Sequence, residues 1–254
     1  MRNILAIANK ELRSYFASPI AYIVIGFFAL LYGFFYFVML RMFVQQSMSA
    51  GIMGGPQSLN VNQQVLRPLF QNVTVVALFI LPMVTMRTYS EEKRAGTIEL
   101  LLTSPLTDFE IVMGKFLGAM GLYGAMLLIT VFHIGVLFVF GRPEWKPLLT
   151  AYLGFFLFGA CFVSLGLFIS SLSKNQIVAG TVTFAVFLLL WIVSWIGSII
   201  PGAEKLTSYL SIVDHFDDFT KGVIDTSHLI YYASFITLGL FLTAKSVESE
   251  RWRG

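Results

Sequence analysis

The side chains of this chain most suited to chemistry or recognition are concentrated between Ser90 and Lys115, which read SEEKRAGTIELLLTSPLTDFEIVMGK. The segment combines carboxylates and cations with a short run of leucines. The chain contains neither a G-x-S-x-G serine motif nor an H-E-x-x-H zinc motif, and both are signatures of hydrolytic sites. These residues therefore favour recognition of a partner over catalysis.

The composition indicates a protein whose solvent is a lipid bilayer. Of 254 residues, 57% are hydrophobic and only 12% are charged, about half the charged fraction of a soluble domain. The net charge of +3 is too small to suggest nucleic acid as a partner. The single cysteine, Cys161, excludes an internal disulfide and is expected to be a buried structural thiol.

Six charge-free runs approach the ~20 apolar residues that a membrane-spanning helix needs. The sequence therefore predicts an all-α membrane protein of one domain over residues 1–254. The predicted spans are residues 20–40, 69–86, 116–140, 147–173, 175–203 and 227–244.

The distribution of lysine and arginine predicts the orientation of these spans. If the N-terminus lies inside, the inner segments hold 11 of the 17 basic residues. Cytoplasmic loops carry such an excess, which predicts that both termini and the segment at 87–110 are cytoplasmic.

Residues 1–17 are too polar to span but are patterned as an amphipathic helix. One face carries an apolar set, and the other carries Lys10 and Arg13. We expect an interfacial elbow helix that is either a passive anchor or also a partner contact. The apolar set is Ile4, Leu5, Ala8, Leu12, Tyr15 and Phe16.

The segment at 87–110 contains its own helix start and stop signals. Gly96 is suited to a left-handed helix end, and Thr97 to capping a new helix with Glu99 in its first turn. Pro105 requires that helix to stop by Ser104. Because such a short helix is unstable alone, its leucines must pack on the protein's own spans or in a groove on a partner.

The third span has a predicted start just after this short helix. Thr107 and Glu110 have the spacing of a capping box, and Leu106 and Ile111 that of a hydrophobic staple. The helix that they begin places Lys115 at the membrane surface.

Other segments give less specific predictions. Residues 41–67 are rich in Gln, Asn, Gly and Ser and predict a flexible external loop. Pro82 predicts a kink in span two. His133 is expected to be neutral and bonded to Thr130. Small residues in span four, which permit close helix approach, are Gly154, Gly159, Ala160 and Gly166.

Residues 204–226 predict an external amphipathic helix, or re-entrant segment, in the outer interface. On this interpretation Asp214, Asp217 and Asp218 face water, and a metal site with His215 is the weaker alternative. The apolar set is Leu206, Tyr209, Leu210, Ile212, Val213, Phe216 and Phe219.

The segment at 87–115 resembles the signature of the type-2 family of ATP-binding-cassette (ABC) membrane subunits, the permeases of many bacterial exporters. The matching residues are Glu92, Arg94, Gly96-Thr97, Leu101-Leu102, Pro105 and Gly114-Lys115. The six spans and the elbow agree with that family. The resemblance implies that this loop is a coupling helix docked in a cytoplasmic ATPase. The residues implied in docking are Glu92, Arg94, Gly96, Thr97, Glu99, Leu101 and Pro105.

The resemblance also implies the partners and the location. We expect a cytoplasmic cassette ATPase that binds ATP and Mg, and a second permease subunit, identical or different. An external auxiliary membrane protein and residence in the bacterial inner membrane are further expectations. Within the family, SPIAY at 18–22 and HFDDFTKGVID at 215–225 look most like the gliding-motility-associated permease. A permease for copper-enzyme maturation is a close relative by the same features.

The chain itself lacks a nucleotide-binding loop. Gly114-Lys115 is followed by Phe116 and has no upstream glycine at P-loop spacing. We therefore expect no cofactor in this chain and no enzymatic activity of its own. A secondary transporter or channel is the alternative, disfavoured because no Asp, Glu, Lys or Arg lies deep in a predicted span. A membrane enzyme comes third.

Overall fold

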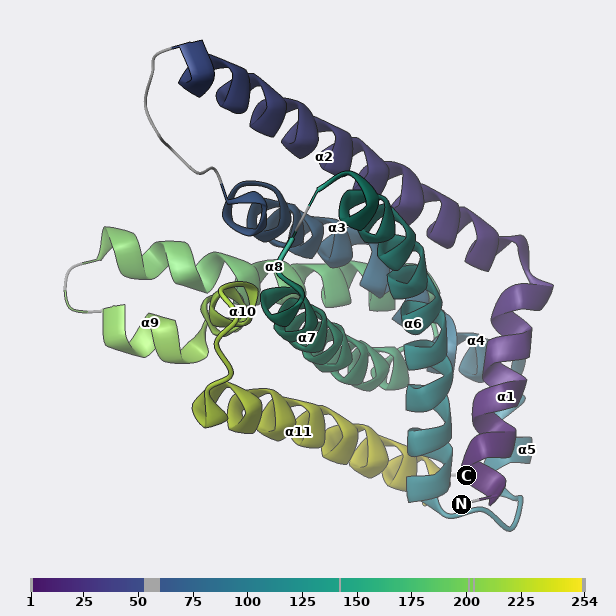
Figure 1. Ribbon diagram of the computed structural model, residues 1–254. Coiled ribbons are helices and arrows are strands. Elements are labelled where there is room, and N and C mark those ends of the chain that lie inside the picture. Colours follow the sequence, from purple (N-terminus) through teal and green to yellow (C-terminus); the bar gives the residue numbers. More distant parts are fainter. Residues whose placement is uncertain (1, 53–59, 142, 201, 203, 253–254) are drawn as a thin grey trace.

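The structure is a computed structural model that describes residues 2–52, 60–141, 143–200, 202 and 204–252 (Figure 1). Within these ranges the chain is helical without a strand, as predicted. The elements are α1 (Arg2–Ala17), α2 (Pro19–Ile52), η1 (Asn62–Leu66), α3 (Arg67–Thr85), α4 (Arg87–Ala95), α5 (Ile98–Leu102), α6 (Asp108–Phe140), α7 (Trp145–Leu172), α8 (Gln176–Ile199), α9 (Glu204–Leu210), α10 (Ile212–Thr220) and α11 (Thr226–Arg251).

In the described residues, six helical stretches are long and apolar enough to cross a membrane, one at each predicted span. The predicted spans 147–173 and 175–203 run beyond their stretches, Trp145–Leu172 and Gln176–Ile196. The chain is therefore a multi-pass membrane protein. Helices α3 and α7 are mostly buried and form the centre of the bundle, whereas α2, α8 and α11 expose most of their surface. Helix α1 lies across the end of the bundle beside α6, next to α5 (Figure 1).

The prediction of a flexible loop over residues 41–67 is wrong at both ends. Helix α2 continues to Ile52, and a π-helical turn at Asn62–Leu66 leads directly into α3. Residues 41–50 contain neither glycine nor proline, so nothing in them stops a helix. The rest of the predicted loop at 53–59 lies outside the described residues. Pro82 lies inside α3, which ends at Thr85.

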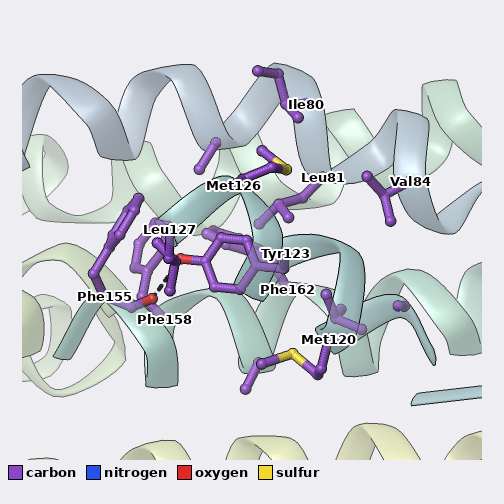
Figure 2. Packing of buried hydrophobic residues seen from close by; sticks show 14 of the residues in the cluster. Ile80, Leu81, Val84, Met120, Tyr123, Met126, Leu127, Phe155, Phe158 and Phe162 are labelled. Carbon is purple, nitrogen blue, oxygen red and sulfur yellow. Dashed lines mark hydrogen bonds between the residues drawn. The ribbon is translucent and has the colours of Figure 1, made fainter. Parts of the chain in front are cut away.

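The core is built from aliphatic and aromatic side chains that pack around close helix crossings. Figure 2 shows Tyr123 of α6 lying among phenylalanines of α7, with its hydroxyl donating to the Phe155 carbonyl oxygen at 2.7 Å. The ring lies where a side chain on Gly159 would be. Gly166 is equally close to Thr85 of α3. The predicted role of these small residues in close helix approach is confirmed.

The external segment is broken rather than continuous. Ser211 separates α9 from α10 and caps α10 by accepting from the Asp214 N–H at 3.1 Å. Ile212, Phe216 and Phe219 are buried within the protein core, with Phe219 next to Gly154 of α7. The apolar residues of α9 are exposed. The predicted single interfacial helix is therefore wrong for α10, which packs inside the protein.

Of the aspartates predicted to face water, Asp214 is exposed as predicted, whereas Asp217 and Asp218 are partly buried in ion pairs. Asp217 accepts two hydrogen bonds from the Arg67 Nη2 atom at 3.0 Å, and Asp218 forms an ion pair with Lys221 at 2.8 Å. These pairs tie α10 to the start of α3 and to the turn after α10. Within the described residues, no three His, Cys, Asp or Glu side chains form a group that could hold a metal ion.

Two groups inside the spans, His133 and Cys161, have structural surroundings. The His133 Nδ1 atom lies 3.1 Å from the Ile129 carbonyl oxygen rather than bonding to Thr130, which instead contacts the Tyr152 hydroxyl at 2.8 Å. That prediction is wrong because the Thr130 hydroxyl also bonds back to its own helix. Cys161 is fully buried, as predicted.

The glycine contacts give a prediction with opposite signs at two sites. Gly166→Ala places a methyl group against the Thr85 side chain and should destabilise the protein by about 1–3 kcal/mol. Gly124→Ala has open space at the same atom and should be neutral or stabilising by up to about 1 kcal/mol through helix propensity. Thermal melts in detergent compare the two variants, and equal melting temperatures would contradict the proposed close approach.

Candidate functional site

The polar segment starts with α4, which continues span two and ends at Gly96. Gly96 has φ of 70°, in the left-handed region, as predicted. Its N–H and that of Thr97 both donate to the Glu92 carbonyl oxygen. These two hydrogen bonds end the helix and reverse the chain. The left-handed backbone that they require would be strained for a residue with a Cβ.

Helix α5 follows immediately and does not use the predicted cap. The Thr97 backbone is already helical, and its side chain makes no capping bond. Hydrogen bonds are made instead at the C-terminal end of α5, where the Thr103 and Ser104 hydroxyls donate to the carbonyl oxygens of Glu99 and Leu101. The helix ends at Leu102, before Pro105, as the proline predicts.

The apolar side chains of α5 divide between two directions. Ile98 is buried, and Leu101 and Leu102 pack half-buried against the core. Leu100 is 73% exposed, and Glu99 beside it is also exposed. Of the residues predicted to dock, Leu101 therefore faces the protein's own spans, and Leu100 is the leucine that faces outward.

Span three restarts the chain as the sequence predicts. The Thr107 hydroxyl accepts from the Glu110 N–H at 3.2 Å, and the Glu110 carboxylate accepts from the Thr107 N–H at 3.1 Å, which completes the capping box. The Asn3 amide donates to Glu110 at 3.1 Å. The start of α1 is thus tied to the start of α6.

Helix α1 packs closely along α6 over a row of glycines spaced at about one helical turn. A Cβ on Gly114 would lie 2.5 Å from the Ile7 Cβ, and one on Gly118 would lie 2.6 Å from the Glu11 Cβ. The buried face of α1 is Ile7, Glu11 and Tyr15. This face is rotated from the predicted one, and Leu5 points outward.

A buried ion cluster lies between α1, α4 and α6. Lys115 of α6 is fully buried, and its Nζ atom lies 2.9 Å from the Glu11 Oε1 atom and 2.8 Å from the Glu92 Oε2 atom. The same Nζ donates to the Thr88 carbonyl oxygen at 2.9 Å and lies 5.0 Å from the centre of the Tyr89 ring. Lys115 is shielded from solvent because α1 covers it.

Lys10 completes the cluster on its exposed side. Its Nζ atom lies 2.9 Å from the Glu92 Oε1 atom and 3.3 Å from Glu11. Burial lowers the pKa of Lys10, but the hydrogen bond to Glu92 and the nearby Glu11 outweigh it, so the net shift is upward. Two lysines and two glutamates make the cluster neutral, which is the condition for burying charge in a protein.

The last turn of α11 holds both sides of the segment. The Lys93 Nζ atom lies 2.7 Å from Glu250, and Arg251 lies 3.0 Å from Asp108 and donates to the Leu106 carbonyl oxygen at 3.1 Å. These contacts hold the residues just before α5, at Lys93, and just after it, at Leu106 and Asp108. Arg13 and Arg94 are exposed at this end of the molecule, as is Pro105.

Two open clefts border α5 and α4. One, of about 360 Å³, lies between α1 and α4 and includes Lys10, Glu91 and Thr97. The other, of about 460 Å³, is lined by residues of α4, α5, α11 and the α7–α8 turn, including Glu99 and Lys174. The segment therefore lies between two open clefts.

Sequence reasoning missed the central residues of this site, Glu11 and Lys115. Glu11 stands one helical turn from both Ile7 and Tyr15, so an acid on an otherwise apolar stripe was a usable signal. The one-turn spacing of Gly114, Gly118 and Gly121 also marks a surface for a close helix partner. Neither signal names the partner, which is far away in sequence.

These features define a class, a multi-pass helical membrane protein with a short, ion-braced helix between spans two and three. Residues 56–216 match the profile described as ABC-2 family transporter protein. The chain belongs to this family.

Two curated relatives are the proteins described as probable multidrug ABC transporter permease YbhR in Escherichia coli K12 and O157:H7. Each is 29% identical over 163 residues, which cover 63% of this chain and 43% of the relative. The match thus spans less than half the length of these relatives.

The ion cluster predicts a large difference between its two lysines. Lys115→Met leaves the Glu11 and Glu92 carboxylates with only the exposed Lys10 as a cation and should cost about 3–5 kcal/mol of folding stability. Lys10→Met removes a cation that is 59% exposed and should cost at most about 1 kcal/mol. Thermal melts in detergent measure both.

A second substitution tests the cause of the Lys115 effect. Adding Glu11→Gln to Lys115→Met removes one of the two carboxylates that then share a single cation. The double variant should therefore recover part of the lost stability. A Lys115→Met protein as stable as the wild type would show that the cluster does not hold these helices.

Proposed function

We propose that this chain is the permease subunit of an ABC transporter and that α5 is its coupling helix. A separate cytoplasmic ATPase would bind ATP and Mg and dock on α5, and a second permease subunit would complete the pore. The observation that carries the proposal is an exposed leucine, Leu100, on a short helix whose flanking residues are held by ion pairs to three other helices. Glu92 pairs with α1 and α6, and Lys93 and Asp108 pair with α11. Family membership supports it.

The shape of α5 suits docking into a groove. A helix of five residues is not stable on its own, and here Ile98 fixes it to the core from one side. Leu100 and the nearby Phe109 remain exposed at the same end of the molecule. A buried apolar anchor beside a polar rim is the usual anatomy of a tight contact, and Glu99 provides part of that rim.

The ties around α5 supply a path for force. Glu92, four residues before Gly96, is paired with Lys115 of α6 and Lys10 of α1. On the other side, Lys93 and Asp108 are held by the end of α11. A displacement of α5 by an ATPase would therefore move α1, α6 and α11 together rather than bend a loop.

The proposed orientation follows from the basic residues. With 11 of 17 lysines and arginines on the side of α5 and both termini, this side is assigned to the cytoplasm of a bacterial inner membrane. The resulting motion would serve export or the transmission of force to an external partner protein. The resemblance at 18–22 and 215–225 favours a role in gliding motility.

Docking of an ATPase on α5 predicts that the same substitution, Leu→Asp, affects ATPase binding at Leu100 but not at Leu206. Leu100→Asp should abolish binding of the purified protein to a cassette ATPase from the source genome, because it puts a carboxylate in the docking groove. Leu206→Asp is a matched control, since Leu206 is 68% exposed on the short helix α9 at the opposite end. Pull-down in detergent measures binding, and equal binding by both variants would sink the proposal.

The orientation has its own test. In a Cys161→Ala background, Glu99→Cys and Lys205→Cys each provide one exposed thiol at opposite ends of the bundle. A membrane-impermeant maleimide should label Lys205→Cys in cells with a permeabilised outer membrane and should label Glu99→Cys only after lysis. The reverse pattern would place α5 outside and exclude docking to a cytoplasmic ATPase.

A further inference from the structure

Two histidines at the opposite end of the molecule face each other at hydrogen-bond distance. The Nδ1 atom of His215, in α10, lies 2.6 Å from the Nδ1 atom of His228, in the first turn of α11. Their ring centres are 4.8 Å apart, and the His215 ring stacks on Tyr231 at 3.9 Å. The pair joins α10 to α11.

The other nitrogen of each ring has a partner that only accepts. The His215 Nε2 atom lies 3.2 Å from the Tyr209 carbonyl oxygen, and the His228 Nε2 atom lies 2.9 Å from the Asp218 Oδ2 atom. The hydrogen bond from Lys221 is the largest influence on the pKa of Asp218, which lies below its ordinary value, so this carboxyl is ionised. Both Nε2 atoms must therefore carry a hydrogen.

This constraint fixes the proton count of the pair. A neutral imidazole has one N–H, and here each ring uses it at Nε2. Two neutral rings would then point two lone pairs at each other across 2.6 Å. We propose that His215 and His228 form a binding site for one additional proton, shared along the line between their Nδ1 atoms.

The surroundings place that proton on His228. His228 lies against the Asp218 carboxylate, which stabilises a positive charge. Burial, together with the charge of His228, keeps the pKa of His215 below its ordinary value despite the Tyr209 carbonyl. His228 is then an imidazolium that donates to both Asp218 and His215. The other titratable or charged groups facing the pair from α3, α10, α11 and their turns are Arg67, Asp214, Asp217, Lys221, Asp225 and Tyr231.

The pair forms one end of a cavity of about 730 Å³ between α9, α10 and α11, with Phe235 and Leu238 on its apolar wall. While protonated, it joins the end of α9, through Tyr209, to α10 and α11. Loss of the proton leaves facing lone pairs, which must separate and loosen this seam. The inference does not depend on docking of an ATPase.

The direct test uses the intact wild-type protein, which has three histidines. In ¹⁵N-histidine-labelled protein, NMR at pH 7.5 should show one imidazolium, coupled to a neutral ring with hydrogen at Nε2. His133→Gln identifies the signal of the third histidine, which lies elsewhere, in α6. Two neutral rings at pH 7.5 would overturn the proposal.

Two further arms keep the result specific. The spectrum of His133→Gln should keep the imidazolium signal at pH 7.5, whereas His228→Asn, which removes one ring of the pair, should lose it. An imidazolium signal unchanged in His228→Asn would overturn the proposal. So would Nδ1 signals that shift with added ZnCl₂ and return with EDTA, because they would show a metal site in place of the proton site.

Discussion

The buried charge of Lys115 is the constraint on which the arrangement of helices at the α1 and α5 end of the molecule depends. An isolated ammonium away from water is costly, so anionic partners must reach it. Those partners are 104 and 23 residues away in sequence, at Glu11 and Glu92, and they arrive on two different helices. Neutralising one side chain therefore determines where α1 and α4 lie relative to α6.

The glycines of α6 make this arrangement sterically feasible. Gly114 and Gly118 allow the α1 backbone to approach so closely that the Glu11 carboxylate reaches beneath the helix to Lys115. Close packing and charge pairing therefore depend on each other. Without the glycines Glu11 would not reach Lys115, and without Glu11 the covered Lys115 would lack an anionic partner on α1. The same pattern recurs at the other end, where Arg67 and Lys221 compensate the aspartates of α10.

The sequence was sufficient for features set by local chemistry. Hydrophobic runs located the six spans, and the capping box at Thr107 and the turn at Gly96 appear as predicted because neighbouring residues alone produce them. The features that could not be predicted depend on distant partners. The Lys115 cluster and the burial of α10 against α7 require knowing which helices meet, and the composition of a loop does not say so.

The close contact of α1 with α6 also has a geometric consequence. Interlocked over three glycines, α1 cannot slide along α6 in small steps, so the two helices behave as one rigid lever. Helix α6 has 33 residues, which at ~1.5 Å per residue gives an arm of about 50 Å. A tilt of about 5° at its base would displace the far end by about 4 Å, roughly the diameter of a methyl group. Motions too small to rearrange any side chain near Lys115 would thus be amplified across the full thickness of the membrane.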